Sequence, residues 1–380
     1  MRLIIDRIMK PVQRAVLLAL GMILVLSLPV RAEDLPRQLS DRDFWKLIAD
    51  MSEPDGFFQY ENFVSNEDDY STVLPALSRT VKPGGIYLGV GPEQNFTYIA
   101  TFRPGIAFVV DIRRQNMLEH LLYKALFEIS SSRNDFVSRL FSRPAIAGIS
   151  DSSTAEALLK PYEAAKPDQK LFDSNLAAIY SRITNTHGFA LSKEDKTGIT
   201  KVLKAFFDGG PAMDYRFASY SAPTPSATYT QLMDAADREG RRWSYLATEA
   251  NFRFIQDYEK RNLIVPLVGD FAGARAIRAV GQYAKAHNAA VSVFYTSNVD
   301  EYLFRDAAKD RFFSNVATLP IDPSSAMIRA LGGPGGPPVG FQLAPGKRWT
   351  AVWCSMPDIV KAFNSGRLQV RTDANRLCNK

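Results

Sequence analysis

The fold of this chain is decided by residues 86–116, which read IYLGVGPEQNFTYIATFRPGIAFVVDIRRQN. A short β-forming run ends at Gly89. Gly91 follows after one intervening residue, and Pro92 occupies a position suited to the first turn of a helix. The sequence then predicts a helix over 94–101 and a continuous apolar strand over 106–110, closed by Asp111. A strand, glycine turn, helix and second strand, with an acid about 20 residues beyond the glycines, predict the nucleoside-binding half of a doubly wound α/β sheet.

The residues after the glycine turn indicate a ligand without phosphate. Dinucleotide-binding turns carry a third glycine that lets the helix pack closely around a pyrophosphate, and here that position is Gln94, beside Glu93. A carboxylate at a helix N-terminus competes with a bound anion for the same amides. We therefore expect a phosphate-free ligand with some positive charge, such as S-adenosylmethionine, with Asp111 accepting hydrogen bonds from a ribose. The alternative is that Gly89 and Gly91 only make a tight turn and Asp111 caps the next helix.

Residues 1–32 have the pattern of a secretory signal peptide. Basic residues precede an apolar run over 15–30, and Val30-Arg31-Ala32 offers small residues at the positions that a signal peptidase requires. The apolar run is shorter than the roughly 20 residues that a membrane span needs. We expect cleavage after Ala32, export to the periplasm or the medium, and no membrane span afterwards. The alternative is an uncleaved anchor.

The composition is that of an ordinary globular protein, with 46% hydrophobic and 23% charged residues among 380. Residues 1–32 hold five of the 46 basic and one of the 40 acidic residues, so the net charge falls from +6 to +2 once they are removed. This balance, without a basic stripe, argues against a nucleic-acid partner. The two cysteines, Cys354 and Cys378, either form a disulfide in an oxidising compartment or stay free, and their spacing does not suggest a metal site.

The chain is expected to form one doubly wound, mostly parallel sheet with a helical insertion. The predicted parts are a helical and lid-forming segment over 33–85, the first half of a Rossmann-like domain over 86–150, a helical insertion over 151–260, the second half over 261–330, and a Gly/Pro loop with a C-terminal tail over 331–380. Further strands are predicted over 145–149, 262–271, 291–295, 316–319 and 348–354. Pro266 is awkward for a central strand because it cannot donate to a neighbouring strand.

Ligands of such sheets bind outside the carboxyl ends of the strands. The residues expected there to contact a small-molecule ligand are Gly89, Gly91, Pro92, Glu93, Gln94, Asn95, Asp111, Arg113, Asn116, Asp270 and Phe271. The residues expected to form a lid or to contact a substrate are Asn62, Ser65, Asn66 and Glu67, at the end of an aromatic run, and Tyr295, Ser297 and Asn298, after a later strand. The alternative for the 57–67 segment is a simple capped loop.

The sequence offers few groups for acid–base chemistry. Only His120, His187 and His287 are bases suited to neutral pH, and none has a serine or cysteine nucleophile at a recognisable spacing. Neither a G-x-S-x-G elbow nor a G-x-x-x-x-G-K-[ST] phosphate loop occurs, so hydrolase and ATPase functions lack support. Methyl transfer mainly requires that donor and acceptor be held in line, which suits such a site. No catalytic residue is assigned.

The stretches YLGVGPEQN and VVDIRRQN resemble the glycine motif and the second-strand acid of class I S-adenosylmethionine-dependent methyltransferases. Together with SDRDFWKLI and FVSNE, they also resemble a group of uncharacterised bacterial methyltransferase-like proteins, as far as about Tyr302. The resemblance implies that Gly89 and Gly91 face the methionine part of the cofactor and Asp111 its ribose. Two departures are the Gln94 in place of the third glycine and a fourth strand that ends in Gly269-Asp270-Phe271, without the aromatic-proline signature of amine methyltransferases.

Three functions are compatible with these observations. The first is an exported methyltransferase that acts on an unknown acceptor. The second is an exported non-catalytic protein that keeps the pocket and binds another small ligand. The third is an envelope interaction protein whose glycines are only structural.

Overall fold

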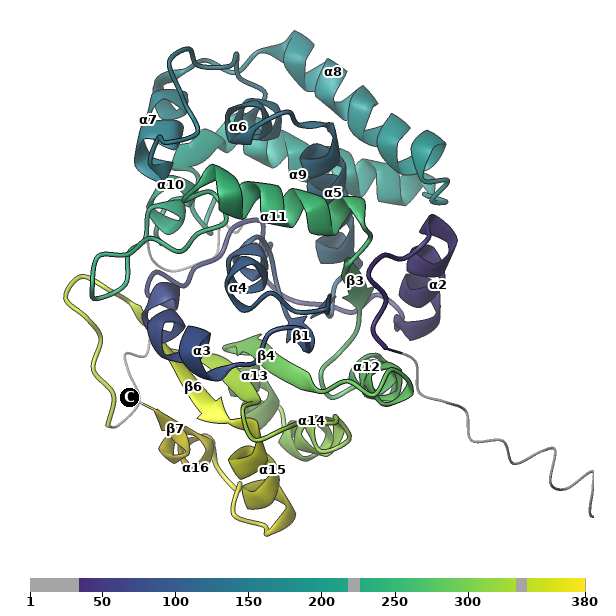
Figure 1. Cartoon of the computed structure of the whole chain (residues 1–380), viewed down its shortest axis with the longest axis vertical. Helices are drawn as coiled ribbons and strands as arrows, with labels where there is room; N and C mark the ends of the chain where they lie inside the picture. Colours follow the sequence, from purple (N-terminus) through teal and green to yellow (C-terminus); the bar gives the residue numbers. More distant parts are fainter. Residues whose placement is uncertain (1–33, 218–225, 333–339, 380) are drawn as a thin grey trace, which may run out of the picture. The chain divides into compact units, whose positions relative to one another are not determined.

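The centre of the fold is a seven-stranded sheet with the strand order β3-β2-β1-β4-β5-β6-β7 (Figure 1). A computed structural model describes residues 34–217, 226–332 and 340–379; the predicted signal peptide and most of the Gly/Pro loop lie outside the described residues. The strands are β1 (Ile86–Gly89), β2 (Ile106–Asp111), β3 (Ile264–Val268), β4 (Val291–Ser297), β5 (Ala326–Gly332), β6 (Trp349–Ser355) and β7 (Cys378–Asn379). The first five are parallel, and β6 runs antiparallel to β5 and β7. The prediction of an α/β fold with a mostly parallel sheet is confirmed.

The strand order reverses between β1 and β4. The chain runs outward from β1 to β2 and β3, then returns to place β4 on the other side of β1, with β5 beyond it. This pattern is compatible with a Rossmann-like fold, in which the reversal opens a crevice at the carboxyl ends of the strands.

Helices cover both faces of the sheet (Figure 1). One face carries α4 (Gln94–Phe102), α5 (Arg114–Ile129) and α11 (Glu249–Lys260); the other carries α12 (Ala276–Ala286), α14 (Lys309–Val316) and α15 (Met356–Asn364). The remaining helices are α2 (Asp41–Met51), η1 (Tyr70–Val73), α3 (Leu74–Thr80), α6 (Arg133–Phe141), α7 (Ala155–Ala164), α8 (Gln169–Tyr180), η2 (Ser181–Thr186), α9 (Lys193–Gly209), η3 (Gly210–Ala212), α10 (Tyr229–Met233), α13 (Val299–Arg305) and α16 (Arg371–Arg376).

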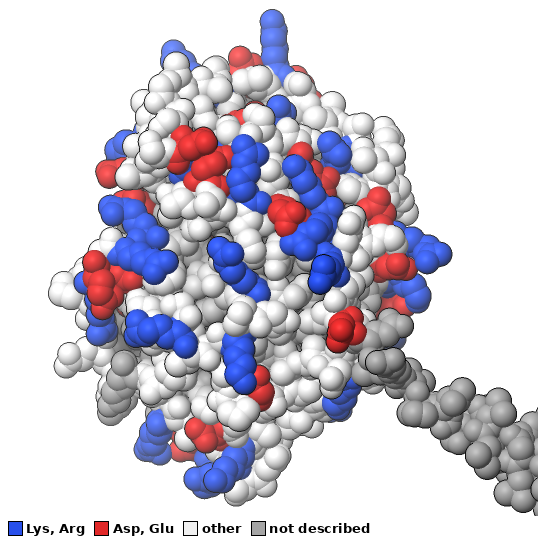
Figure 2. All heavy atoms as spheres, in the orientation of Figure 1, with Lys and Arg blue, Asp and Glu red and all other residues white. Residues whose placement is uncertain are grey.

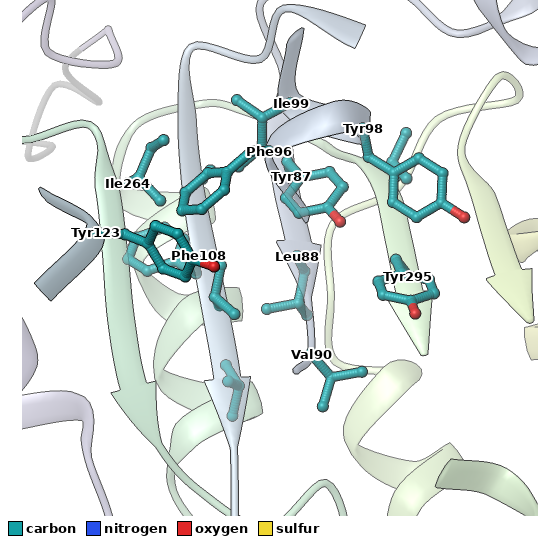
Figure 3. Close-up of a cluster of buried hydrophobic side chains, with 14 of the residues drawn as sticks. Tyr87, Leu88, Val90, Phe96, Tyr98, Ile99, Phe108, Tyr123, Ile264 and Tyr295 are labelled. Carbon is teal, nitrogen blue, oxygen red and sulfur yellow. The ribbon is translucent and has the colours of Figure 1, made fainter. Parts of the chain in front are cut away.

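The helices of the predicted insertion belong to the same compact unit as the sheet, Leu35–Lys380. Within them, α9 and α11 pack on α5, and α11 also packs on α4. Phe96 of α4 lies at the centre of this packing, with its ring centroid 5.2 Å from those of Tyr123 and Phe127. Figure 3 shows Phe96 close to Tyr123. The apolar runs of β1 and β2 are buried throughout because helices or loops cover both faces.

Two predicted strands are wrong, and two strands were missed. Residues 145–149 form a loop with a turn and residues 316–319 end a helix, so neither joins the sheet. The missed strands are the two-residue β7 and β5, whose apolar run is interrupted by the buried Arg329. Pro266 lies in β3, which is an edge strand of the sheet, and this position tolerates a residue without an N–H donor.

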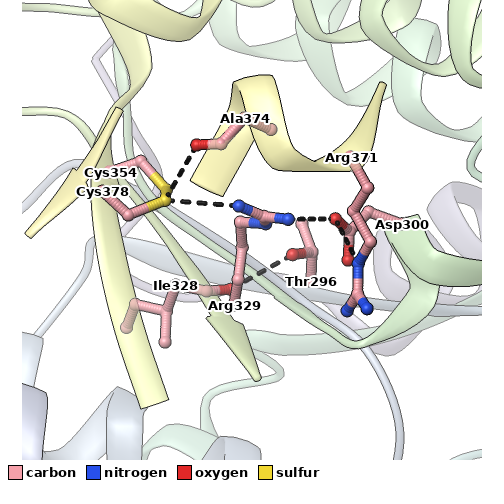
Figure 4. The surroundings of a disulfide bond; sticks show 8 residues. All are labelled: Thr296, Asp300, Ile328, Arg329, Cys354, Arg371, Ala374 and Cys378. Atoms are coloured by element: carbon pink, nitrogen blue, oxygen red, sulfur yellow. Dashed lines mark hydrogen bonds and ion pairs between the residues drawn. A yellow bond between two sulfur atoms is a disulfide. The ribbon is translucent and has the colours of Figure 1, made fainter. Parts of the chain in front are cut away.

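The C-terminal tail is joined to the sheet by a disulfide between Cys354 of β6 and Cys378 of β7 (Figure 4). On the face of the molecule in Figure 2, basic and acidic side chains are interspersed, as the nearly balanced charge of residues 33–380 leads one to expect. None of the helices within residues 34–217, 226–332 and 340–379 combines the length and the apolar character needed to cross a membrane.

Candidate functional site

A cavity of about 420 Å³ lies at the carboxyl ends of β1, β2, β3 and β4. Its size is in the range of small-ligand pockets. Twelve of the eighteen residues predicted to contact a ligand or substrate line it: Gly91, Pro92, Asp111, Asp270, Phe271, Asn62, Ser65, Asn66, Glu67, Tyr295, Ser297 and Asn298. The tertiary structure thus brings together residues from five separate parts of the chain.

The two glycines of the turn have different roles. A Cβ on Gly89 would lie 2.1 Å from Asn95 Oδ1 and 2.7 Å from the Tyr87 ring, so the side chains behind the turn require glycine there. Gly91 has a φ of +78° and no atom within 4 Å of a Cβ position, so its requirement comes from the left-handed backbone. Of the two, only Gly91 lines the cavity.

Asp111 ends β2 and faces the glycine turn. Its Oδ1 accepts a hydrogen bond from the Arg113 backbone N–H at 3.0 Å, and its side chain is buried at the cavity wall. Burial raises the pKa of Asp111, while the Arg113 charge and the backbone N–H groups of Arg113 and Gly91 oppose that rise. The carboxylate is therefore close to the turn, with acceptor capacity left for a ligand hydroxyl.

Six predicted contact residues lie behind the cavity wall instead of on it: Gly89, Glu93, Gln94, Asn95, Arg113 and Asn116. Asn95 Nδ2 donates to the carbonyl oxygens of Val90, Gly91 and Pro92 at 2.8–3.0 Å and so fixes the turn. Arg113 is paired with Glu61, at 3.5 Å. These residues shape the wall because the helices that carry them turn their side chains into the core.

Glu93 departs from its expected role at the helix N-terminus. Both its carboxyl oxygens lie 3.3 Å from the Ser65 backbone N, and burial raises its pKa to about 8. At neutral pH this carboxyl is therefore mostly protonated, and repulsion of an anion by its charge is weak. The carboxyl oxygens still accept from the Ser65 backbone N–H, so this donor is not free to bind a phosphate.

Glu67 is the most completely enclosed acid on the cavity wall, at 2% exposure. It accepts hydrogen bonds from Gln94 Nε2 at 3.0 Å, from Tyr295 Oη at 2.8 Å, and from Ser297 Oγ. Burial raises its pKa, and the donors Ser297, Gln94 and Tyr295 work against that rise. Gln94, which replaces the third glycine of the motif, thus serves to hold Glu67.

The three histidines lie away from the cavity. His120 lies in the core behind the turn, where its Nε2–H donates to the Gly91 carbonyl oxygen at 2.9 Å, and burial lowers its pKa to about 4. His187 bridges Asp41 and Glu128, and His287 contacts the Tyr283 carbonyl oxygen. A histidine general base at this cavity is therefore absent from the described residues.

Several cavity residues were missed by the sequence analysis. The aromatic side chains Phe57, Phe58, Tyr215 and Tyr302 line the cavity, and the ring centroids of Phe58 and Tyr302 are 5.3 Å apart. Tyr215 comes from the helical insertion and Tyr302 from α13, and no local pattern links them to the glycine turn. The aromatic run over 57–63 was the one available signal.

Gly269-Asp270-Phe271 follows β3, which ends at Val268 and is the third strand of the chain, not the fourth. The prediction counted 145–149 as a strand, and this shifted the numbering. The fourth strand, β4, ends at Ser297 and continues as Asn298-Val299-Asp300, which also lacks the aromatic-proline signature.

Metal binding finds no support in the part of the chain that the structure describes, because it contains no group of three or more His, Cys, Asp or Glu side chains that could hold an ion.

Residues 62–364 match a protein family described as a domain of unknown function (DUF7790), and the chain belongs to that family. The match begins at Asn62, so it includes most of the cavity wall but not Phe57, Phe58 and Gln59. No curated protein matches the chain.

Proposed function

We propose that this chain binds S-adenosylmethionine in the cavity and is a methyltransferase for a small acceptor. The observation that carries the proposal is that Gly91, Asp111 and Asp270, on three successive strand ends, line one cavity together with the polar residues after β4. The bound ligand would supply an activated methyl group on a sulfonium centre.

The side chains present fit such a ligand. Asp111 has an acceptor oxygen for ribose hydroxyls, and the space beside Gly91 is open. Among the described residues, the acids on the wall are Glu67, Asp111, Asp270 and Asp306, and the arginines are Arg305, which pairs with Asp306 at 2.8 Å, and Arg311. This surplus of carboxyl groups favours a cationic ligand over a phosphate ester.

In this proposal the chain contributes binding and orientation. Asp111 fixes the ribose, the turn at Gly91 allows close approach, and the segment over 57–67 covers the ligand and excludes water. Holding donor and acceptor in line is sufficient to accelerate methyl transfer by a large factor, without a dedicated base.

Calorimetric titration of the purified chain with S-adenosylmethionine and S-adenosylhomocysteine tests the proposal. We expect binding of both, weakened about tenfold or more in Asp111→Asn, because a neutral amide is a poorer acceptor for ribose hydroxyls. Asp310→Asn changes an exposed acid that does not line the cavity; it is the control and should keep the affinity. No heat of binding from either ligand, or an unchanged affinity in Asp111→Asn, would contradict the proposal.

A non-catalytic ligand-binding protein is the second candidate, and the predicted export signal over 1–32 favours it because S-adenosylmethionine is made in the cytosol. Cell fractionation with N-terminal sequencing of the mature chain tests export. A mature chain that begins at Glu33 in the periplasm or medium, together with silence toward both adenosyl ligands, would favour this second function.

A further inference from the structure

We propose that the end of the cavity formed by Glu67, Tyr295 and Ser297 binds the ammonium group of an organic amine. This inference deepens the proposed function, on which its catalytic meaning rests, by assigning a ligand class to one end of the same cavity. The binding step itself does not depend on a methyl donor.

The first argument is the unbalanced charge of Glu67. Within the described residues, no lysine, arginine or histidine forms an ion pair with this carboxylate, although it is 2% exposed. Its nearest charged neighbour on the chain, Asp68, is another acid that raises its pKa further. A buried carboxylate without a cation is costly, so a ligand cation at this point would gain more than at an exposed acid.

The second argument is the remaining hydrogen-bonding capacity. An ionised carboxylate offers about four acceptor positions. Two hydroxyl donors reach Oε1, from Tyr295 and Ser297, and one amide donor reaches Oε2, from Gln94. The carboxylate therefore keeps room for about one further donor, and Glu67 lines the cavity from which that donor would come.

The third argument is that the carboxylate is held rigidly. Ser65 Oγ donates to Gln94 Oε1 at 2.5 Å, which fixes the Gln94 amide so that Nε2 points to Glu67. Ser297 has a φ of +52°, a left-handed conformation that is uncommon for a residue with a side chain and that recurs at binding sites. Figure 3 shows Tyr295 beside Tyr98, with their ring centroids 4.8 Å apart, so the Tyr295 hydroxyl is also fixed by packing.

The surroundings indicate an amine with an apolar body. Phe58 and Tyr302 line the same cavity, as does Arg311, and two other nearby arginines are paired with acids: Arg113 lies 3.5 Å from Glu61 and Arg305 lies 2.8 Å from Asp306. An ammonium group on an aromatic or aliphatic body therefore finds a carboxylate at one end and apolar rings elsewhere.

The same ammonium chemistry has two sources, the α-amino group of the adenosyl ligand or a separate amine acceptor. Two matched pairs of probes distinguish them. S-adenosylhomocysteine carries the amino group and 5′-methylthioadenosine lacks it; phenethylamine is a cation and 2-phenylethanol is its neutral counterpart. Calorimetric titration of the purified chain with each probe, near neutral pH, gives the four affinities.

We expect the ammonium-bearing member of at least one pair to bind about tenfold or more tightly than its partner, and Glu67→Gln to remove that difference. If Glu67→Gln removes the preference for S-adenosylhomocysteine, the subsite binds the amino group of the methyl donor. If it removes the preference for phenethylamine alone, the subsite binds a separate amine. Asp310→Asn, which changes an exposed acid outside the cavity lining, should preserve the difference. An unchanged melting temperature shows that the Glu67→Gln variant folds. The comparison of the probes within each pair on the wild-type chain does not depend on any variant.

Equal affinities within both pairs, no binding by any ammonium-bearing probe, or an undiminished preference in a folded Glu67→Gln variant would each overturn the proposal. Phenethylamine preference without any adenosyl binding would leave the subsite standing and refute the methyltransferase function. If both adenosyl probes bind with equal affinity and phenethylamine is not preferred, the ammonium subsite is refuted and the binding of an adenosyl ligand stands.

Discussion

At the residue scale, glycine is required at positions 89 and 91 for two different physical reasons. Gly89 has no space for a side chain, because Asn95 Oδ1 would lie 2.1 Å from a Cβ and Tyr87 2.7 Å from it. Gly91 has space but adopts a φ of +78°. A motif that looks uniform in the sequence is thus partly a packing requirement and partly a backbone requirement.

Replacing each glycine by alanine separates these reasons. We expect Gly89→Ala to lower the free energy of unfolding by about 3 kcal/mol, because Asn95 must leave the turn carbonyls. Gly91→Ala should cost about 1–2 kcal/mol, the strain of a left-handed alanine. Gly281→Ala, within α12 and with its nearest neighbour atoms at 3.4 Å, is the control and should be neutral or stabilising by up to about 1 kcal/mol. Urea denaturation measures all three; a Gly89→Ala variant as stable as wild type would show that the turn packing is wrong.

At the scale of elements, the buried pair Arg329–Asp300 connects β5 to α13, a wall of the cavity. Arg329 Nη2 donates to Asp300 Oδ2 and its Nη1 donates to Cys378 Sγ at 3.3 Å, while Arg371 lies 3.5 Å from the same Asp300 oxygen (Figure 4). The arginine and the aspartate are almost completely buried. The pair therefore couples the disulfide-bonded edge of the sheet to the helix that carries Tyr302 and Arg305.

Replacing Arg329 and replacing Asp300 should lower the stability of the protein by different amounts. In Arg329→Met, Asp300 keeps Arg371 as a partner, so we expect the free energy of unfolding to fall by about 3 kcal/mol. In Asp300→Leu, the enclosed Arg329 has no carboxylate partner, and the free energy of unfolding should fall by up to about 5 kcal/mol. The double variant Arg329→Met/Asp300→Leu should recover much of this stability, because no charge is left buried without a partner. Denaturation of the three variants checks the order. A double variant as unstable as the sum of the two single ones would contradict the coupling.

At the scale of the whole molecule, His187 ties together segments that are distant in the sequence. Its Nδ1 lies 2.8 Å from Asp41 Oδ1 at the start of α2, and its Nε2 lies 2.7 Å from Glu128 Oε2 near the end of α5. Lys124 and Arg182 also face Glu128, at 2.8 and 3.7 Å, and the imidazole stacks on Phe189. The N-terminal helix, the sheet-covering helix and the insertion meet at this residue.

This junction should make stability depend on pH. Burial works against the charged imidazole, but the hydrogen bonds and charges of Glu128 and Asp41 prevail and raise the pKa of His187 above its ordinary value. A raised folded-state pKa means that the stabilisation is fully present below pH about 6.5 and is lost as pH rises through the folded-state pKa. The stability difference between wild type and His187→Gln should therefore be largest below about pH 6.5 and shrink as the pH rises through the folded-state pKa of His187.

Urea denaturation of both proteins across this pH range provides the measurement. Asp41→Asn removes one of the two acidic partners of His187. The folded-state pKa of His187 should then be raised less, so its stabilising effect should be lost at a lower pH than in the wild type. A difference between wild type and His187→Gln that grows with pH would mean that the imidazole is held neutral in the folded protein.

The sequence alone determined the central unit of the fold. Apolar runs over 86–88 and 106–110, the glycine turn between them and Asp111 after the second run are local signals, because burial on both faces of a strand leaves a continuous apolar stretch. The same locality explains why α4 was predicted with the correct first residue, Gln94. It also explains why β5 was missed: Arg329 breaks its apolar run, and its partner Asp300 is remote in the chain.

Only the tertiary structure decided which polar groups share the cavity. Glu67 and Ser297 are separated by 230 positions, and Glu67 and Gln94 by 27, so neither hydrogen bond follows from hydrophobic periodicity or turn propensity. Local patterns fix elements because each element must satisfy its own backbone and hide its own apolar face. The contacts of Glu67 arise only when the packed sheet brings the ends of its strands and the preceding loop to one place, and that depends on the whole chain.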